Sequence, residues 1–174
     1  TACAVAQGLA LGAGCLVIPV DSLLIVAQAA RSALPGPALK TLEVGVVMDA
    51  RMGEVYHAPL QWQAAQQWRT LEPVRVTAPT VVPALPMCDG PASVQLWRGC
   101  GSGFAAHGLA LQQVWGGALG QTPSAEFTAL VPEAGSILRL AMPTLLNGQG
   151  LPAAQALPVY IRDRVALKAG ERRP

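Results

Sequence analysis

The sequence predicts a mixed α/β fold, on the basis of three observations. Residues 1–33 read as a helix, a short strand and a second helix. Residues 41–104 are rich in β-branched and alternating apolar residues, which predicts strands paired as a meander. Residues 132–148 carry a long apolar pattern that predicts a closing helix. A chain of 174 residues can bury an ordinary core as one domain or as two small lobes.

The first two helices are set by an alanine-rich stretch and by a capping residue. The first is expected over Thr1–Leu11, which runs into the helix-stopping glycines Gly12 and Gly14. The apolar run Cys15–Val20 follows and predicts a buried strand. Asp21 can cap the second helix, Ser22–Ala33, which the sequence LPGP ends.

The central region begins with a predicted β-hairpin. Residues 41–50 are β-branched and apolar, residues 54–62 alternate, and the short junction between them contains Gly53. A third strand is expected within residues 68–79 and a fourth within residues 93–104, the latter running into a glycine-rich turn.

The closing helix is expected to begin near Pro132 and Glu133 and to run through residues 134–148. Pro143 lies inside this pattern, so we expect it to kink or shorten the helix.

Composition indicates a protein that binds a partner through an uncharged surface. The chain is 52% hydrophobic and 13% charged, whereas about 25% charge is typical of globular domains. The chain contains twelve Lys and Arg and ten Asp and Glu, which gives a net charge of +2. This is far below the positive charge that is typical of a domain that binds nucleic acid on its own. The first 20 residues are uncharged, but Gln7, Pro19 and several glycines argue against a membrane span.

The cysteines and histidines do not form a metal-binding pattern. Cys3, Cys15, Cys88 and Cys100 are scattered without a C-x-x-C pair, which predicts reduced thiols in a cytosolic protein. His57 and His107 stand alone in the sequence, so no zinc site is expected. No Gly-x-Ser-x-Gly elbow marks a serine nucleophile.

The segment MDARMGEVYHAPL, residues 48–60, concentrates charge between two apolar runs. A catalytic reading would require a nucleophile or metal beside Asp49, Arg51 and Glu54, and neighbouring side chains on a hairpin alternate between faces. The interpretation that we favour is structural: Gly53 supplies the turn and Asp49 and Arg51 hold it by charge-assisted hydrogen bonds. A contact with a partner remains the alternative.

A glycine run, Gly99, Gly101 and Gly103, is a further candidate, because exposed backbone amides can bind phosphate. The run has neither the dinucleotide-binding spacing nor the Gly-Lys-Ser/Thr of a P-loop. A plain turn is the simpler reading, with a nucleotide contact as the alternative.

Four segments together resemble the bacterial TsaB family, also called YeaZ. They are VAQGLALG (residues 5–12), IPVDSLLIVAQ (18–28), MDARMGEVY (48–56, with Tyr56) and LPVYIRDRVALK (157–168), in order across nearly the whole chain. The resemblance implies an actin-like (ASKHA) fold of duplicated ribonuclease-H-like lobes. Residues 1–38 would be the remainder of the first, incomplete lobe and residues 39–174 the second lobe. Opening strands and a glycine-rich loop are then expected before Thr1, making this an N-terminally truncated chain.

The resemblance also implies a function. Family members are non-catalytic, pair with the catalytic paralogue TsaD or with a second copy of themselves, and work with the ATPase TsaE. The complex uses ATP to place threonylcarbamoyl on adenosine beside the tRNA anticodon. This implies a cytoplasmic scaffold with no cofactor of its own, which contacts tRNA indirectly and no membrane. Alternatives are an actin-like kinase or acyltransferase fragment with nucleotide at Gly99–Gly103, and a homodimerising module unrelated to tRNA.

The resemblance places the partner interface on the first two helices. Small and apolar residues there would allow a partner helix to approach closely; the candidates are Ala2, Val5, Ala6, Leu9, Ala10, Leu23, Val26 and Ala27. The alternative is that both helices cover the sheet of their own lobe.

The C-terminal tail carries Arg162, Arg164, Lys168, Arg172 and Arg173 against two acidic residues. Such a tail is usually solvated, with contact to tRNA phosphates as the alternative.

Overall fold

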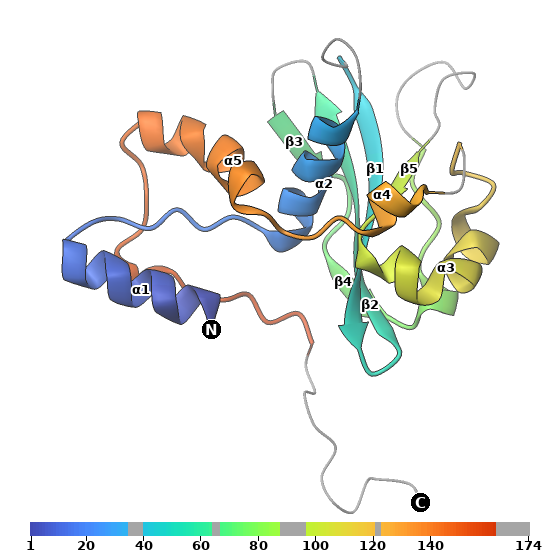
Figure 1. Cartoon of the computed structure of the whole chain (residues 1–174), viewed down its shortest axis with the longest axis horizontal. Helices are drawn as coiled ribbons and strands as arrows, with labels where there is room; N and C mark the ends of the chain where they lie inside the picture. Colours follow the sequence, from blue (N-terminus) through green and yellow to red (C-terminus); the bar gives the residue numbers. More distant parts are fainter. Residues whose placement is uncertain (35–39, 64–66, 88–96, 121–122, 163–174) are drawn as a thin grey trace, which may run out of the picture.

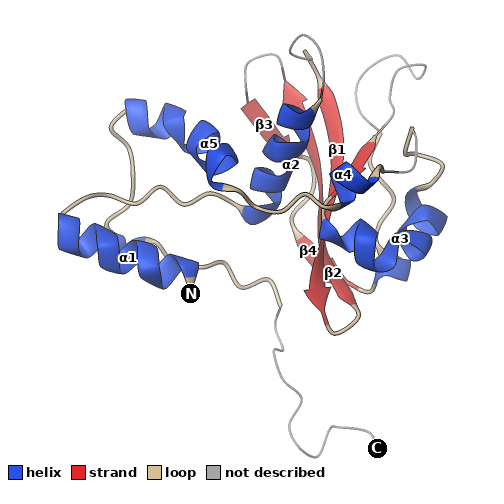
Figure 2. Cartoon of the chain, viewed as in Figure 1, coloured by secondary structure: helices blue, strands red, loops and turns tan. Residues whose placement is uncertain are grey.

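The computed structural model describes residues 1–34, 40–63, 67–87, 97–120 and 123–162. It confirms a mixed α/β fold built on one sheet (Figures 1 and 2). The α-helices are α1 (Ala2–Ala13), α2 (Ser22–Ala33), α3 (Ser102–Trp115), α4 (Ala125–Thr128) and α5 (Ala134–Leu146). The strands are β1 (Leu42–Arg51), β2 (Glu54–Gln63), β3 (Gln67–Thr70), β4 (Arg75–Thr77) and β5 (Arg98–Cys100). Two short 3₁₀ helices, η1 (Pro79–Val81) and η2 (Ala153–Gln155), complete the described elements.

The sheet has the order β3-β2-β1-β5, with β4 also paired to β2. The predicted hairpin is present: β1 and β2 are antiparallel, from Leu42 opposite Trp62 to Arg51 opposite Glu54. β5 joins β1 in parallel. The third predicted strand is two short strands, because Leu71–Val74 separate β3 from β4 and Pro73 within them has no N–H to donate.

The core lies on both faces of the sheet. On one face, Val26 and Ala27 of α2 pack with Val44 and Val46 of β1. The opposite face holds a second cluster that includes Val47 and side chains of α3. Because helices cover both faces, the central strands read as nearly continuous apolar runs instead of strict alternation.

α2 is capped as expected, since Asp21 Oδ1 accepts hydrogen bonds from the backbone N–H groups of Leu23 (2.8 Å) and Leu24 (3.2 Å). α1 ends at Gly14, one of the two predicted stops, whose φ of 65° is left-handed. Gly12, the other predicted stop, lies inside the helix and does not end it. α5 continues through Pro143 to Leu146. The LPGP sequence lies mostly outside the described residues.

Two further expectations were wrong. Cys15–Val20 is not a buried strand: Cys15 and Leu16 are exposed, and Val17 makes only an isolated bridge to Leu151. This run passes beside the segment after α5, away from the sheet (Figure 1). The glycine-rich stretch after β5 is not a turn alone, because it opens helix α3, which the sequence did not predict.

No helix in the described ranges is long and apolar enough to span a membrane.

Candidate functional site

The hairpin turn between β1 and β2 has an unusual backbone. Met52 and Gly53 form a two-residue turn, and Arg51, Met52 and Gly53 have φ values of 63°, 57° and 75°. The register shifts between Asp49 and Arg51, which marks a bulge. Two consecutive non-glycine residues with left-handed φ are costly, so the surrounding contacts must hold this conformation.

Asp49 holds the turn and connects it to α3. Its Oδ1 accepts a hydrogen bond from the Arg51 backbone N–H (2.9 Å), and its Oδ2 lies 3.3 Å from Arg51 Nη1. The Asp49 backbone N–H donates to Ser102 Oγ at the start of α3 (3.1 Å). His107 Nε2 lies 3.8 Å from Asp49 Oδ1. The carboxylate therefore serves as an acceptor for its own turn.

Glu54 and Tyr56 meet a residue from the far end of the chain. Arg162 Nη2 lies 2.6 Å from Glu54 Oε2 and donates to the carbonyl oxygens of Ala50 (3.0 Å) and Arg51 (3.5 Å). Its guanidinium carbon lies 5.9 Å from the centre of the Tyr56 ring. The sequence did not predict this contact, although Glu54 and Arg162 lie in two of the four family-like segments.

His57, the remaining titratable group of β2, is buried and its Nε2 lies 3.1 Å from Thr77 Oγ1. Burial lowers the pKa of His57, nearby Arg75 lowers it further, and Glu72 acts in the opposite direction. In β5, burial raises the pKa of the Cys100 thiol, so this cysteine stays protonated and unreactive.

The predicted interface residues differ in exposure between α1 and α2. On α1, Ala2, Val5 and Leu9 are exposed, Ala6 is half-buried and Ala10 is buried. Their helix stands away from the sheet (Figure 1).

The three α2 candidates, Leu23, Val26 and Ala27, are core residues, with Val26 and Ala27 fully buried. Assigning them to a partner interface is therefore corrected: their spacing places them on the helix face that covers this chain's own sheet.

The glycine run is packed against the sheet. Gly99 lies in β5, where an added Cβ would meet Phe104 at 2.6 Å. Gly101 caps α3 and donates its backbone N–H to Phe127 O (3.0 Å). Added Cβ atoms at Gly101 and Gly103 would lie 2.5 Å from Val47 atoms. These glycines thus allow α3 to approach β1 closely.

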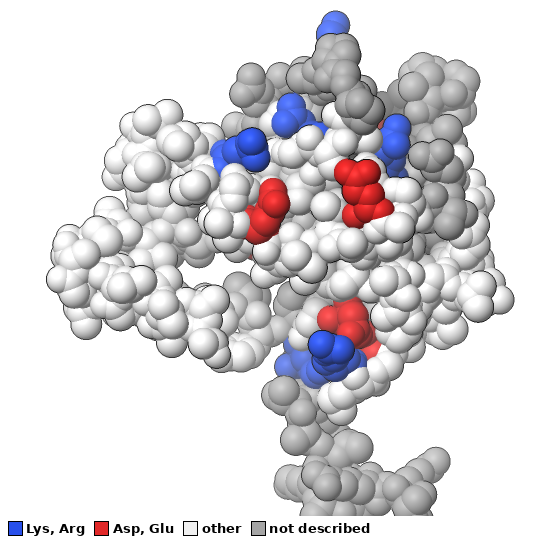
Figure 3. Space-filling view, in the orientation of Figure 1, with Lys and Arg blue, Asp and Glu red and all other residues white. Residues whose placement is uncertain are grey.

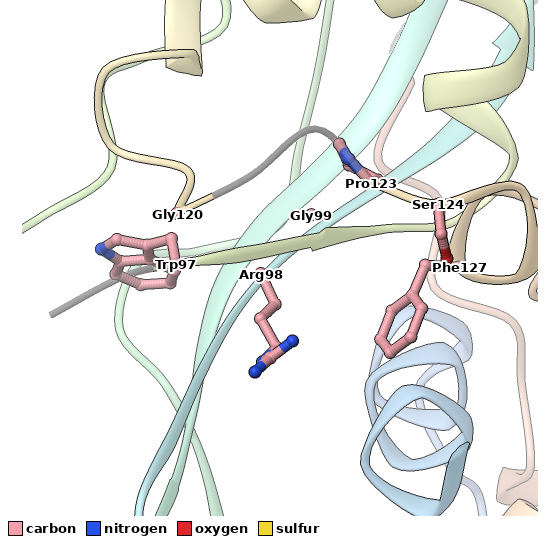
Figure 4. A pocket seen from close by; sticks show the side chains of 7 residues that line it. All are labelled: Trp97, Arg98, Gly99, Gly120, Pro123, Ser124 and Phe127. Atoms are coloured by element: carbon pink, nitrogen blue, oxygen red, sulfur yellow. The ribbon is translucent and has the colours of Figure 1, made fainter. Parts of the chain in front are cut away.

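A cavity of about 220 Å³ borders this run (Figure 4). Trp97, Arg98 and Gly99 line it from the β5 side, and Pro123, Ser124 and Phe127 line it from the other side. In the part of the chain that the structure describes, no three His, Cys, Asp or Glu side chains lie close enough to hold a metal ion. Cys88 and the tail residues Arg164, Lys168, Arg172 and Arg173 lie outside the described residues.

Comparison with known proteins identifies relatives of this chain. No protein-family model matches it. The Escherichia coli K12 protein TsaB, named for tRNA threonylcarbamoyladenosine biosynthesis, is 32% identical over 172 residues, covering 94% of this chain and 64% of that protein. The structure of YeaZ from Pseudomonas aeruginosa has a TM-score of 0.67 and 31% identity, covering 91% of this chain and 66% of that one. Another solved structure, described as similar to the peptidase YeaZ from Pseudomonas aeruginosa, also has a TM-score of 0.67 and 31% identity over 92% of this chain and 66% of its own.

This chain thus spans 64% of the length of the curated relative that it matches. Because the likeness in both sequence and structure extends over more than nine tenths of it, this chain is a homologue of TsaB and of YeaZ over that length.

Proposed function

We propose that this protein is a non-catalytic scaffold subunit in the synthesis of threonylcarbamoyladenosine on tRNA. It would pair through α1 with a TsaD-type catalytic paralogue in the cytoplasm. The name of the E. coli relative supports the pathway. The surface of α1 supports a role in assembly.

The observation that carries the proposal is that α1 is an apolar helix whose outer face is covered by none of the described residues. Val5, Leu9 and Leu11 are exposed by 55%, 70% and 78%. The helix contains no charged residue, and the surface over it carries none in the view of Figure 3. An exposed apolar face of this kind is typical of a protein interface.

α5 extends the same apolar surface beside α1. Leu138, Met142 and Leu145 recur at helical spacing and are exposed by 61%, 43% and 57%. In Figure 1, α1 and α5 lie together on one side of the sheet. A partner that packs on both helices would bury more apolar area than α1 offers alone.

The contacts of the charged hairpin residues support a structural role for this motif. Asp49 accepts from its own turn, and Glu54 pairs with Arg162. Both carboxylates are therefore engaged within the chain, where general acid or base catalysis would require one directed at a substrate.

For the assembly, we propose that ATP is used by a TsaE-type ATPase of the complex, that tRNA contacts the complex mainly through the other subunits, and that the chain alone can pair with itself. The described sheet would belong to the second of two ribonuclease-H-like lobes of an actin-like fold. Under this proposal, residues 1–38 and 39–174 derive from two different lobes. They do not form separate domains in this chain, because α2 packs on the sheet of residues 42–63.

The test is capture of a TsaD-type protein from the same organism by the tagged protein. We expect Val5→Glu combined with Leu9→Glu to weaken capture at least tenfold, because each substitution buries an unpaired charge at the interface. Circular dichroism should show unchanged folding, since both side chains are exposed.

Leu109→Glu on α3 is the matched control, because Leu109 is exposed by 87% and lies on a different surface. Equal capture by the α1 variant, the control and the wild type would contradict the proposal. Self-association without any capture of a TsaD-type protein would favour the homodimerising module instead.

A further inference from the structure

α1 is attached to the rest of the molecule through the segment after α5. It packs against η2, and the Val17 and Leu151 backbones exchange two hydrogen bonds of 2.8 Å. Within α1, which is described throughout, Ala10 is the one buried residue. We call residues 147–162 the strap, because α1 rests on its middle (Figure 1). The orientation of α1 is thus tied to the strap instead of to the sheet.

The strap is anchored at its two ends. Its first residues follow α5, which packs against α2 on the sheet. Its far end is Arg162, which binds the turn of the β1–β2 hairpin. Between η2 and Arg162 the strap has no regular structure, and Leu157, Val159 and Tyr160 are exposed by 65%, 85% and 83%. Among the described residues beyond η2, Arg162 therefore provides the hydrogen bonds that attach the strap to the hairpin.

The hairpin turn gathers several acceptors around the guanidinium of Arg162, mainly at Nη2, while Nε has no hydrogen-bond partner among the described residues. The left-handed residues Arg51 and Met52 turn the carbonyl groups of Ala50 and Arg51 toward the same Nη2 atom that pairs with Glu54. Met52 Sδ lies 3.8 Å from Nη1. The Arg162 side chain is only 14% exposed. Several acceptors around one planar cation give a directional contact that a single surface ion pair lacks.

We propose that Arg162 is a positioning residue: its contact with the hairpin turn fixes the strap and thereby holds α1 in place relative to the sheet. The importance of α1 for a partner rests on the function proposed above, but the positioning itself is a property of this chain. The two family-like segments that meet here, around Glu54 and Arg162, would then serve assembly from a distance, without touching the partner.

Hydrogen exchange measured by mass spectrometry tests the positioning on the full chain, without a partner. In Arg162→Gln, we expect peptides from residues 2–13 and 150–157 to exchange about tenfold faster, because a charge-assisted contact of about 1.4 kcal/mol or more is lost. Peptides from α2 and from β2 beyond the turn should exchange as in the wild type. Glu54→Gln should produce a smaller change in the same peptides, since the two carbonyl acceptors remain.

Arg69→Gln is the control, because Arg69 is an exposed arginine on β3. Arg162→Lys should restore part of the protection, since it keeps the charge but not the planar fork. Unchanged exchange of α1 and the strap in Arg162→Gln, or an equal acceleration in Arg69→Gln, would overturn the proposal. An acceleration spread over the whole chain would also overturn it, because Arg162 would then support the fold in general.

Capture of the TsaD-type protein separates this inference from the proposed function. If both hold, Arg162→Gln weakens capture and Arg162→Lys recovers part of it. If the wild type captures nothing but the exchange of α1 still depends on Arg162, the proposed function fails and the positioning stands. If capture is strong and equal in wild type and Arg162→Gln, with exchange unchanged, the function stands and the positioning fails.

Discussion

His57 is buried in β2 beside Thr77, and its pKa is lowered mainly by burial. The folded protein therefore holds this imidazole neutral at pH values where the unfolded chain, with a pKa of about 6.5, takes up a proton. As the pH falls below about 6.5, proton uptake favours the unfolded state, so the free energy of unfolding should decrease. Above that pH, the contribution of neutral His57 is fully present.

Urea unfolding between pH 5 and 8 measures this effect. We expect the wild type to lose stability on acidification and His57→Gln to lose less, because glutamine keeps a polar group near Thr77 and has no proton to bind. His107→Gln leaves His57 intact and serves as the control. An equally steep loss in wild type and His57→Gln would assign the acid sensitivity to other groups.

The residues of the hairpin motif were identified from the sequence, but their partners were not. Gly53, Asp49 and Arg51 are neighbours in the chain, so turn chemistry alone places them together. Glu54 and Arg162 are separated by 108 positions, and no local pattern indicates which of many arginines will fold back to a given carboxylate. The burial of Val26 and Ala27 was equally ambiguous, because an apolar helix face looks the same whether it covers its own sheet or a partner.

Among the elements, α3 depends most on close packing. Gly101 has a φ of 101°, and an added Cβ would lie 2.5 Å from the Val47 carbonyl oxygen. Gly101→Ala is therefore expected to lower the free energy of unfolding by about 3 kcal/mol or more, through backbone strain and overlap with β1. Thermal and urea unfolding measure the loss.

Gly108→Ala in the same helix is the control, because an added Cβ there meets nothing within 4 Å. Alanine should stabilise the helix at this position by about 0.5–1 kcal/mol. If both alanine variants changed stability by the same amount, close packing at Gly101 would not be the cause.

The elements that the sequence predicted correctly have strong local signals. The capped α2 and the β1–β2 hairpin, with its glycine junction, both formed as expected. α3 was missed because glycines occupy its N-cap (Gly101) and its first turn (Gly103), and no side chain caps it. It forms because those glycines fit against Val47, which is tertiary information. Cys15–Val20 was predicted to be a buried strand because a short apolar run has the same sequence pattern whether it pairs within a sheet or contacts a single irregular segment.

For the whole molecule, α1 and α5 carry a group of exposed apolar residues on one side, while others, such as Met52 and Leu109, lie on other elements. We expect the protein to self-associate through this side as its concentration rises, because burial of apolar surface drives association. Sedimentation velocity should show a larger species that Leu138→Glu combined with Leu145→Glu removes. Leu109→Glu on α3 should leave the association unchanged. If the larger species disappeared in Leu109→Glu, the contact would lie on another surface than α1 and α5.

The parallel pairing of β5 with β1 also bears on the order in which the chain folds. β1 and β2 adjoin in sequence and can pair early, since a hairpin closes in about 1–10 μs. β5 reaches β1 only after the long segment between them is closed, with Val44 opposite Arg98, and such non-local pairing is slow because the loop entropy is lost before contacts form. The hairpin is therefore the expected folding nucleus, and α3 and its face of the core complete the structure afterwards.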